Sequence, residues 1–312
     1  MKRSTCLKWG FLATTGFAFL GCNTQEQVQE GVVVVTEPNE IATGAVASTS
    51  TDTAKPEDSA SAPAADTPKP DATPAAAPAA ATASGWGTLK GRVVFEGDVP
   101  TLDPVVKQGT DVKDAAICAK SDIPNEKLVV DPATKGVRWA IVYIPRPSAV
   151  NPEAESEAKS QVVEFDQKSC QFEPHALAVM KGAKINVKSS DQAGHNVHSQ
   201  LRGTVFNQGI QPGSSVALEI KTPDNRVGRV DCDIHPWMKA WWLTLNNPYF
   251  AVTNEKGEFE IKNVPAGEQK VVVWAEALHP GFVTASGSGD PVTIKPNEET
   301  TADFKFDASK VK

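Results

Sequence analysis

The residues best suited to chemistry lie in one short segment, Cys232-Asp-Ile-His235-Pro-Trp-Met238. If this segment forms a loop, its thiolate, imidazole and thioether can meet at one point. His195 and His198, further upstream, can supply another imidazole. Two imidazoles and a thiolate with a weak axial thioether form the trigonal site that suits copper in electron transfer. Zinc usually recruits further Cys, His or carboxylate ligands, and a thioether suits it poorly.

Each of these residues also has a structural interpretation. A lone cysteine in an exported protein is more often a disulfide partner or an unpaired thiol, and Met238 taken alone would be packed in a core. Trp237 and the proline before it could form an apolar docking patch beside His235, or could simply pack the loop. His175 and His279 lie outside the segment. We expect the first to make structural hydrogen bonds and the second to be solvated.

The elements that would position the loop are short strands separated by turn residues, a pattern typical of a β-sandwich. Apolar residues alternate with polar ones in Lys184–Lys188 and Val216–Ile220, so one face of each strand should point inward. Val137–Ile144 is apolar on both faces and is expected to be one continuous strand deep in a sheet. Residues 151–160 could form a short exposed helix or a loop. Further strands are expected at 88–95, 249–253, 258–261 and 271–274, and the pattern predicts an all-β fold.

The N-terminal region is similar to a bacterial lipoprotein signal. In residues 1–22, three basic residues precede an apolar run, Trp9–Leu20, which is too short to span a bilayer stably and ends at Cys22. Cleavage before Cys22 would leave it as the lipidated first residue; an uncleaved anchor or a cut elsewhere is the alternative. Residues 23–84, rich in Ala, Thr and Pro, should form a disordered tether. We therefore expect the protein in the cell envelope, lipid-anchored to a bacterial membrane and facing the periplasm or the cell surface.

Export to an oxidising compartment changes how the five cysteines are interpreted. Cys6 would leave with the signal and Cys22 would carry lipid. If Cys232 binds a metal, Cys118 and Cys170 remain as a disulfide pair. Such a bridge would contribute roughly 4 kcal/mol on the chain-entropy model. Two buried free thiols are the alternative.

The candidate ligands occur in an order that resembles the small blue-copper cupredoxins, especially the amicyanin-like ones. His195-Asn196-Val197-His198 is followed by the loop from Cys232 to Met238, and the resemblance covers roughly residues 162–245. It implies a Greek-key β-sandwich with one mononuclear type 1 copper. The ligands that it implies are His195, Cys232, His235 and Met238.

The same resemblance implies roles for the neighbours of the ligands. Asn196 would brace the ligand loop, and its backbone N–H would meet the thiolate. His198 would not be a ligand, although it could replace His195. Asp231 and Asp233 flank the cysteine, where an aromatic residue or a histidine usually precedes it. These carboxylates would favour Cu(II) if they pointed toward the metal.

The flanking segments carry a second resemblance, to carboxypeptidase regulatory-like, transthyretin-like β-sandwiches. The segments concerned are Gly87–Val93 and Thr253–Gly267. The resemblance implies a cupredoxin domain inserted into a second small sandwich, which contributes no catalysis. The expected domains are 86–160 for the first part of the outer sandwich, 161–246 for the cupredoxin domain and 247–308 for the second part.

Composition and motifs narrow the function. The net charge of -7 leaves no basic surface for nucleic acid. Four protein ligands would leave no open coordination position, and no Ser-His-Asp order or phosphate loop is present, so we expect no enzyme. The leading hypothesis is one-electron transfer outside the cytoplasm by a lipid-anchored type 1 copper protein, with an unidentified redox protein as donor or acceptor. The alternatives are an envelope-surface scaffold that binds carbohydrate or protein with copper incidental, and copper storage or delivery.

Overall fold

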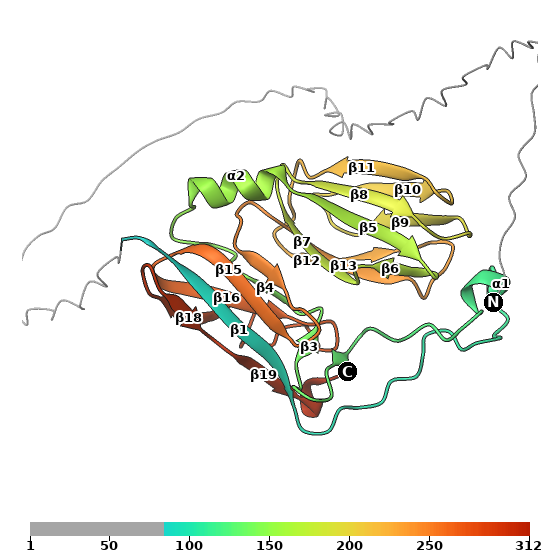
Figure 1. Cartoon of the computed structure of the whole chain (residues 1–312), viewed down its shortest axis with the longest axis horizontal. Coiled ribbons are helices and arrows are strands. Elements are labelled where there is room, and N and C mark those ends of the chain that lie inside the picture. The colour runs from blue at the N-terminus through green and yellow to red at the C-terminus, as the bar shows by residue number, and fades with distance from the viewer. Residues whose placement is uncertain (1–83) are drawn as a thin grey trace, which may run out of the picture. The chain divides into compact units, whose positions relative to one another are not determined.

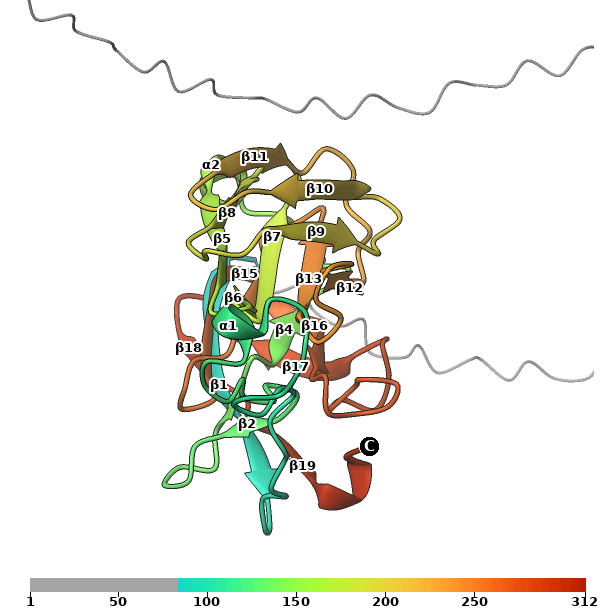
Figure 2. The same ribbon diagram turned by 90° about the vertical axis from the view of Figure 1, so that its right-hand side faces the viewer.

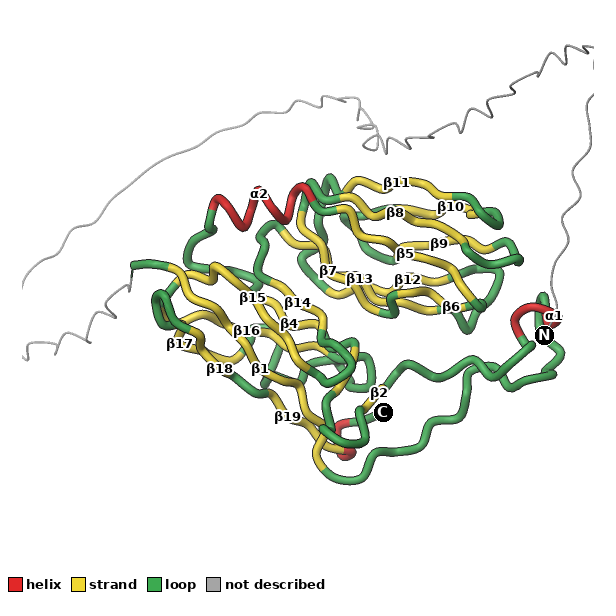
Figure 3. Tube along the Cα trace, viewed as in Figure 1, coloured by secondary structure: helices red, strands yellow, loops and turns green. Residues whose placement is uncertain are grey.

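The computed structural model describes residues 84–312, and nearly all of the regular secondary structure in this part of the chain is β-strand (Figures 1 and 3). The prediction of an all-β fold is confirmed. Four main sheets form two sandwiches, each with its own apolar core. The predicted signal over 1–22, its Cys22, and all but the last residue of the predicted tether over 23–84 lie outside the described residues. Within 84–312, no helix is both long and apolar enough to cross a bilayer.

The sandwich that carries the candidate ligands is called the insert sandwich. One sheet has the order β10-β9-β12-β13-β7 and the other the order β11-β8-β5-β6. Between them, Phe165 stacks on Phe172 at 5.0 Å and meets the edge of Trp242 at 4.9 Å. These three buried rings fill the centre of the core. The strands are β5 (Val162–Lys168), β6 (Gln171–Glu173), β7 (Ala176–Met180), β8 (Lys184–Ser189), β9 (His195–Ser199), β10 (Phe206–Ile210), β11 (Ser215–Glu219), β12 (Val227–Asp231) and β13 (Lys239–Leu245).

The other sandwich is called the outer sandwich, because its strands come before and after the insert in the sequence. In one sheet β1 pairs with β15, β18 and β19, and the other sheet has the order β14-β4-β16-β17. A separate two-stranded sheet joins β2 and β3. The strands are β1 (Trp86–Glu96), β2 (Val129–Val130), β3 (Val137–Arg138), β4 (Ile141–Tyr143), β14 (Phe250–Val252), β15 (Glu258–Pro265), β16 (Gly267–Trp274), β17 (Asp290–Ile294), β18 (Glu299–Thr301) and β19 (Phe304–Asp307), followed by the 3-10 helix Ala308–Lys310.

The insert sandwich begins and ends at neighbouring strands of the outer sandwich. β4 and β14 are antiparallel partners, with Tyr143 opposite Phe250. The backbone N–H of Ile144 donates to the carbonyl of Tyr249 at 2.9 Å, just where the chain departs and returns. A third apolar cluster, which includes Tyr143, Leu243 and Trp274, joins strands of both sandwiches.

Two expectations about local structure need correction or completion. The expected continuous strand Val137–Ile144 is wrong, because it breaks into β3 and β4 at Trp139, whose φ is 68°. The break lets the Trp139 indole N–H donate to Glu126 at 3.1 Å. The segment left undecided forms helix α2 (Pro152–Ser160), capped by the side chain of Asn151. Proline at the start and an Asn cap are common signals for the beginning of a helix.

The residues between β1 and β2, 97–128, are called the arm. The arm contains the short helix α1 (Ala115–Cys118; Figure 2) and buries Val106 and Ile123 in the core of the insert sandwich. A disulfide joins Cys118 to Cys170, which directly precedes β6. The sequence placed these residues in the first part of the outer sandwich, over 86–160. They differ from that expectation in part. Val106, Ala119 and Ile123 pack in the core of the insert sandwich, whereas Leu128 packs in the core of the outer sandwich.

Candidate metal centre

The pairing of β9 with β12 brings the candidate ligands together. These strands are antiparallel, with His198 opposite Asp231. The start of β9, which is His195, therefore lies beside the residues that follow the end of β12. Those residues form the turn from Cys232 to Met238 that leads into β13. The turn is closed by backbone hydrogen bonds from Cys232 N to Met238 O at 3.2 Å and from Met238 N to His235 O at 2.9 Å.

Three donor atoms converge at this end of the sandwich. The Nδ1 atoms of His195 and His235 are 2.9 Å apart, and Cys232 Sγ lies 3.9 Å from Nδ1 of His235. The three residues each offer a donor atom within 4.8 Å of the others, a spacing that can enclose one metal ion. All three are buried, with His235 fully inaccessible to solvent. Two imidazole nitrogens and a thiolate in a dry pocket fit a soft transition-metal ion such as copper.

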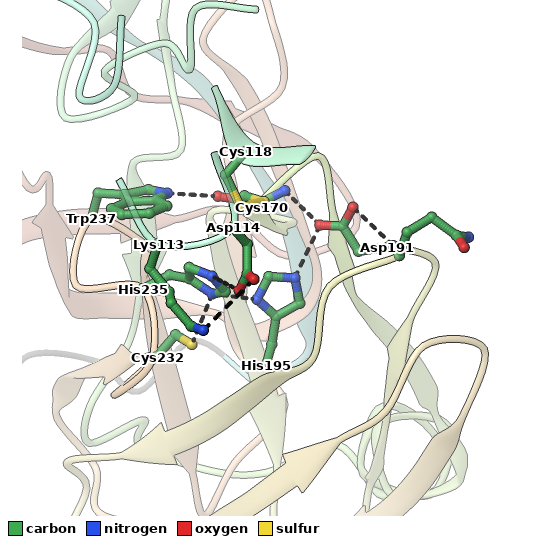
Figure 4. The surroundings of a disulfide bond; sticks show 10 residues. Lys113, Asp114, Cys118, Cys170, Asp191, His195, Cys232, His235 and Trp237 are labelled. Carbon is green, nitrogen blue, oxygen red and sulfur yellow. Dashed lines mark hydrogen bonds and ion pairs between the residues drawn. A yellow bond between two sulfur atoms is a disulfide. The ribbon is translucent and has the colours of Figure 1, made fainter. Parts of the chain in front are cut away.

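The outer nitrogen of each imidazole contacts a carboxylate (Figure 4). Nε2 of His195 lies 3.0 Å from Oδ2 of Asp191, and Nε2 of His235 lies 3.0 Å from Oδ2 of Asp114. A carboxylate accepts a hydrogen bond from Nε2–H, which leaves the Nδ1 lone pair of the same ring for a metal. The two carboxylates therefore fix the tautomers in which both Nδ1 atoms can act as ligands.

Burial lowers the pKa of His195, and the hydrogen bond from its ring to Asp191 opposes this effect. A lowered pKa favours the neutral imidazole, which is the form that can bind a metal.

Neither carboxylate was predicted from the sequence. Asp114 lies in the arm, 121 residues before His235, and no local pattern connects them. Asp191 is four residues before His195 in the turn that leads into β9. A carboxylate at this spacing from a candidate ligand is a signal that could have been noticed, although it is weak.

The carboxylates that the sequence placed near the thiolate have other partners. Asp231 pairs with Arg229, 2.8 Å from its Nε, and Asp233 lies 3.0 Å from Nδ1 of His198. The contact with His198, followed by the one with Asn196, lowers the pKa of Asp233. Asp231 and Asp233 therefore each have a partner of their own.

The other predicted site residues lie around this centre. Asn196 accepts a hydrogen bond from the backbone N–H of Asp233 at 2.7 Å, and its amide donates to the Asp233 carboxylate at 2.8 Å. Its side chain therefore ties β9 to the ligand turn. Met238 is buried in the same core as Cys232. The Trp237 ring lies 5.1 Å from that of His235, and its indole N–H donates to Cys170 O at 3.2 Å.

Three further observations delimit the site. Cys170 Sγ, Asp191 and His195 also lie within 4.8 Å of one another, but that sulfur is already bonded to Cys118. His175 contacts Glu276 at 2.6 Å and Glu126 at 3.6 Å. His279 is exposed and lies three residues after Glu276.

Comparisons with known proteins find likeness only among solved structures. No protein-family model and no curated protein matches the sequence. Amicyanin from Paracoccus versutus is 12% identical over 33% of this chain and 96% of that chain, with a TM-score of 0.24. The purple cupredoxin from Nitrosopumilus maritimus is 18% identical over 26% of this chain and 98% of that chain, with a TM-score of 0.23.

A third similar structure is the copper-containing nitrite reductase from Thermus scotoductus SA-01. It is 18% identical over 26% of this chain, with a TM-score of 0.25. The match spans 22% of the reductase chain. At TM-scores this low the likeness carries no argument about the function of the protein.

Proposed function

We propose that this protein binds one copper ion at the centre formed by His195, Cys232, His235 and Met238, and that it transfers single electrons without catalysing a reaction. The observation that carries the proposal is the convergence of two Nδ1 atoms and one Sγ within 4.8 Å in a buried pocket. This donor set suits copper in electron transfer. The proposed partner is a redox protein outside the cytoplasm, and the proposed anchor is a lipid on Cys22 at the end of a flexible tether.

The residues of the chain would hold the ion in a rigid, dry setting. Copper, when bound, carries one electron by alternating between Cu(I) and Cu(II). The strands β9, β12 and β13 fix the positions of His195, Cys232 and His235, so little has to move when the charge changes. Burial of all three side chains excludes water from the donor atoms. Met238 supplies the weak fourth ligand in this proposal.

The visible spectrum of the purified protein tests the proposal. One equivalent of Cu(II) should produce an intense visible band from thiolate-to-copper charge transfer, which chemical reduction should bleach reversibly. Cys232→Ser should remove the band because it removes the thiolate. The matched control is His198→Ala. It removes a partly exposed histidine of β9, the strand that also carries His195, and should leave the band in place. A band that survives Cys232→Ser, or a protein that binds no copper, contradicts the proposal.

Reversible redox cycling separates electron transfer from copper storage. A storage or delivery protein would take up Cu(I) and pass it to an acceptor without cycling. A centre that is oxidised and reduced repeatedly with retention of copper supports the electron-transfer proposal. Quantitative loss of copper to a Cu(I) chelator in each cycle contradicts it.

A further inference from the structure

The Asp114 side chain does not cap α1, the helix that it precedes. Asp114 occupies the N-cap position of α1, where an Asp side chain normally accepts a hydrogen bond from the first turn. Its carboxylate makes no such bond, and its backbone adopts the left-handed conformation, with φ 55° and ψ 38°. This backbone conformation is uncommon in a residue other than glycine. The carboxylate instead contacts Nε2 of His235 at 3.0 Å.

The Asp191 side chain is held in a matching position on the other ring. Its Oδ2 accepts a hydrogen bond from the backbone N–H of Cys170 at 2.6 Å and contacts Nε2 of His195 at 3.0 Å. The Asp191 side chain is 7% exposed and the His195 side chain 0%. A buried carboxylate with two hydrogen-bond donors has little freedom to turn away from the ring.

One covalent bond links the supports of the two carboxylates. Cys118 lies at the end of α1, the helix that follows Asp114, and its disulfide partner Cys170 donates to Asp191. The arm and the segment before β6 are therefore fastened to each other where both reach the centre, as Figure 4 shows. Asp114 comes from outside the insert sandwich, so the strands that carry the ligands do not by themselves complete the centre.

We infer that Asp114 and Asp191 are positioning residues of the metal centre, and that through His235 and His195 they bias it toward the doubly charged ion. The inference rests on the proposed function, because it concerns the same centre. An accepting carboxylate holds Nδ1 toward the metal and makes it a stronger donor. Two nearby negative charges stabilise Cu(II) more than Cu(I), because the attraction grows with the charge of the ion.

The test compares Asp114→Asn and Asp191→Asn with Asp111→Asn. The amide oxygen of Asn can still accept from Nε2–H, so the first two variants remove charge and keep the shape. Asp111 is exposed and lies in the same arm, so its variant removes the same charge away from the ring. We measure Cu(II) and Cu(I) dissociation constants and the midpoint potential of each copper-loaded variant.

Loss of either positioning carboxylate should weaken Cu(II) binding by about tenfold and leave Cu(I) binding nearly unchanged. The midpoint potential should then rise by about 59 mV, the one-electron equivalent of a tenfold change. Asp111→Asn should keep the midpoint potential of the natural protein. Asp114→Glu, which keeps the charge, should retain most of the preference for Cu(II) over Cu(I) that Asp114→Asn loses. If Asp114→Asn and Asp111→Asn shift the potential equally, or neither shifts it, the inference is overturned.

A measurement on the protein without copper tests the positioning role of the carboxylates by itself. Nitrogen-15 spectra of the imidazoles should show hydrogens on Nε2 of both His195 and His235. In Asp114→Ala, the Nε2 hydrogen of His235 should exchange faster while that of His195 is unchanged. Unchanged exchange at His235 overturns the positioning role. A natural protein that binds no copper but gives the expected spectra refutes the proposed function and leaves the positioning of the rings supported.

Discussion

In His195 and His235, the two nitrogens of each ring contact different groups. The Nδ1 atoms meet each other and Sγ of Cys232, whereas the Nε2 atoms meet carboxylates. Each ring therefore lies between a carboxylate and the position proposed for the metal. This arrangement depends on rotamers held from several sides, and Asn196 supplies one of the supports for the turn.

Replacing Asn196 by Ala should loosen the ligand turn. The substitution leaves the backbone N–H of Asp233 without its acceptor and removes the amide donor to the Asp233 carboxylate. We expect the free energy of unfolding to fall by about 1–3 kcal/mol. Urea denaturation of the metal-free protein measures the effect. Asn186→Ala is the control, because its amide donates to Glu164 on the surface and should cost much less. Equal losses in the two variants would refute a bracing role for Asn196.

The ligand segment could be found in the sequence because a turn of seven residues carries thiolate, imidazole and thioether together. Its topology completes the centre, since β9 must pair with β12 to add His195. Asp114 could not be found this way, because its contact with His235 spans 121 residues and arises from the path of the arm. A carboxylate in an irregular segment leaves no periodic signal in a sequence.

Few contacts hold the arm to the rest of the described chain. It has one short helix and one isolated bridge, between Val106 and Ile123. The disulfide and most of its buried residues connect it to the insert sandwich, while Leu128 packs in the outer sandwich. Segments with so little secondary structure open more easily than the sheets beside them.

The double variant Cys118→Ser, Cys170→Ser should release the arm. The native bridge spans a sequence separation of 52 residues. On the chain-entropy model its loss should lower the free energy of unfolding by roughly 4 kcal/mol. Trypsin should then cut the arm at its exposed lysines, Lys107, Lys113 and Lys120, before it cuts the sheets.

Cys232→Ser is the control for this experiment, since it removes a buried thiol and keeps the disulfide. Mass spectrometry of the early fragments distinguishes the two variants. If the arm of the double variant resists trypsin as well as the arm of the control, packing of the arm suffices and the bridge is not needed to hold it.

Element boundaries followed the sequence where a strand had a regular apolar pattern, as in Lys184–Ser189. The pattern failed in Val137–Ile144, where both faces are apolar and nothing local marks the break at Trp139. The break is set by distant groups, since Thr253 accepts from the backbone N–H of Trp139 and its hydroxyl accepts from that of Ala140. Tertiary contacts therefore decided where this strand ends, against the local pattern.

At the scale of the whole described chain, one apolar cluster connects the two sandwiches, and Tyr143 belongs to it. Tyr143 is 4% exposed, and burial raises its pKa to about 12 from an ordinary value of 10.0. The neutral ring is favoured in the folded protein, and the unfolded chain ionises first. Stability from this residue is thus fully present below pH 10.0 and is lost as the pH rises toward about 12.

Tyr143→Phe should reduce the alkaline loss of stability. A difference of about two pKa units corresponds to roughly 3 kcal/mol once both states have ionised. Urea denaturation at pH 9 and at pH 11.5 should show a smaller decrease for the variant than for the natural protein. Burial also raises the pKa of Tyr249, the other tyrosine, so some decrease should persist. An identical decrease in variant and natural protein would refute the contribution of Tyr143.

Because β4 and β14 are neighbours, the insert sandwich lies between two adjacent positions of the outer sandwich. Excision of residues 145–248 would join two ends that are already hydrogen-bonded, through Ile144 and Tyr249, so a tight turn could close the gap. The excision would, however, strip the apolar side chains of the arm, Val106 and Ile123, of the core that covers them. Transfer of the insert sandwich into another protein would therefore have to carry two separate stretches of coding sequence, one for the arm and one for the insert.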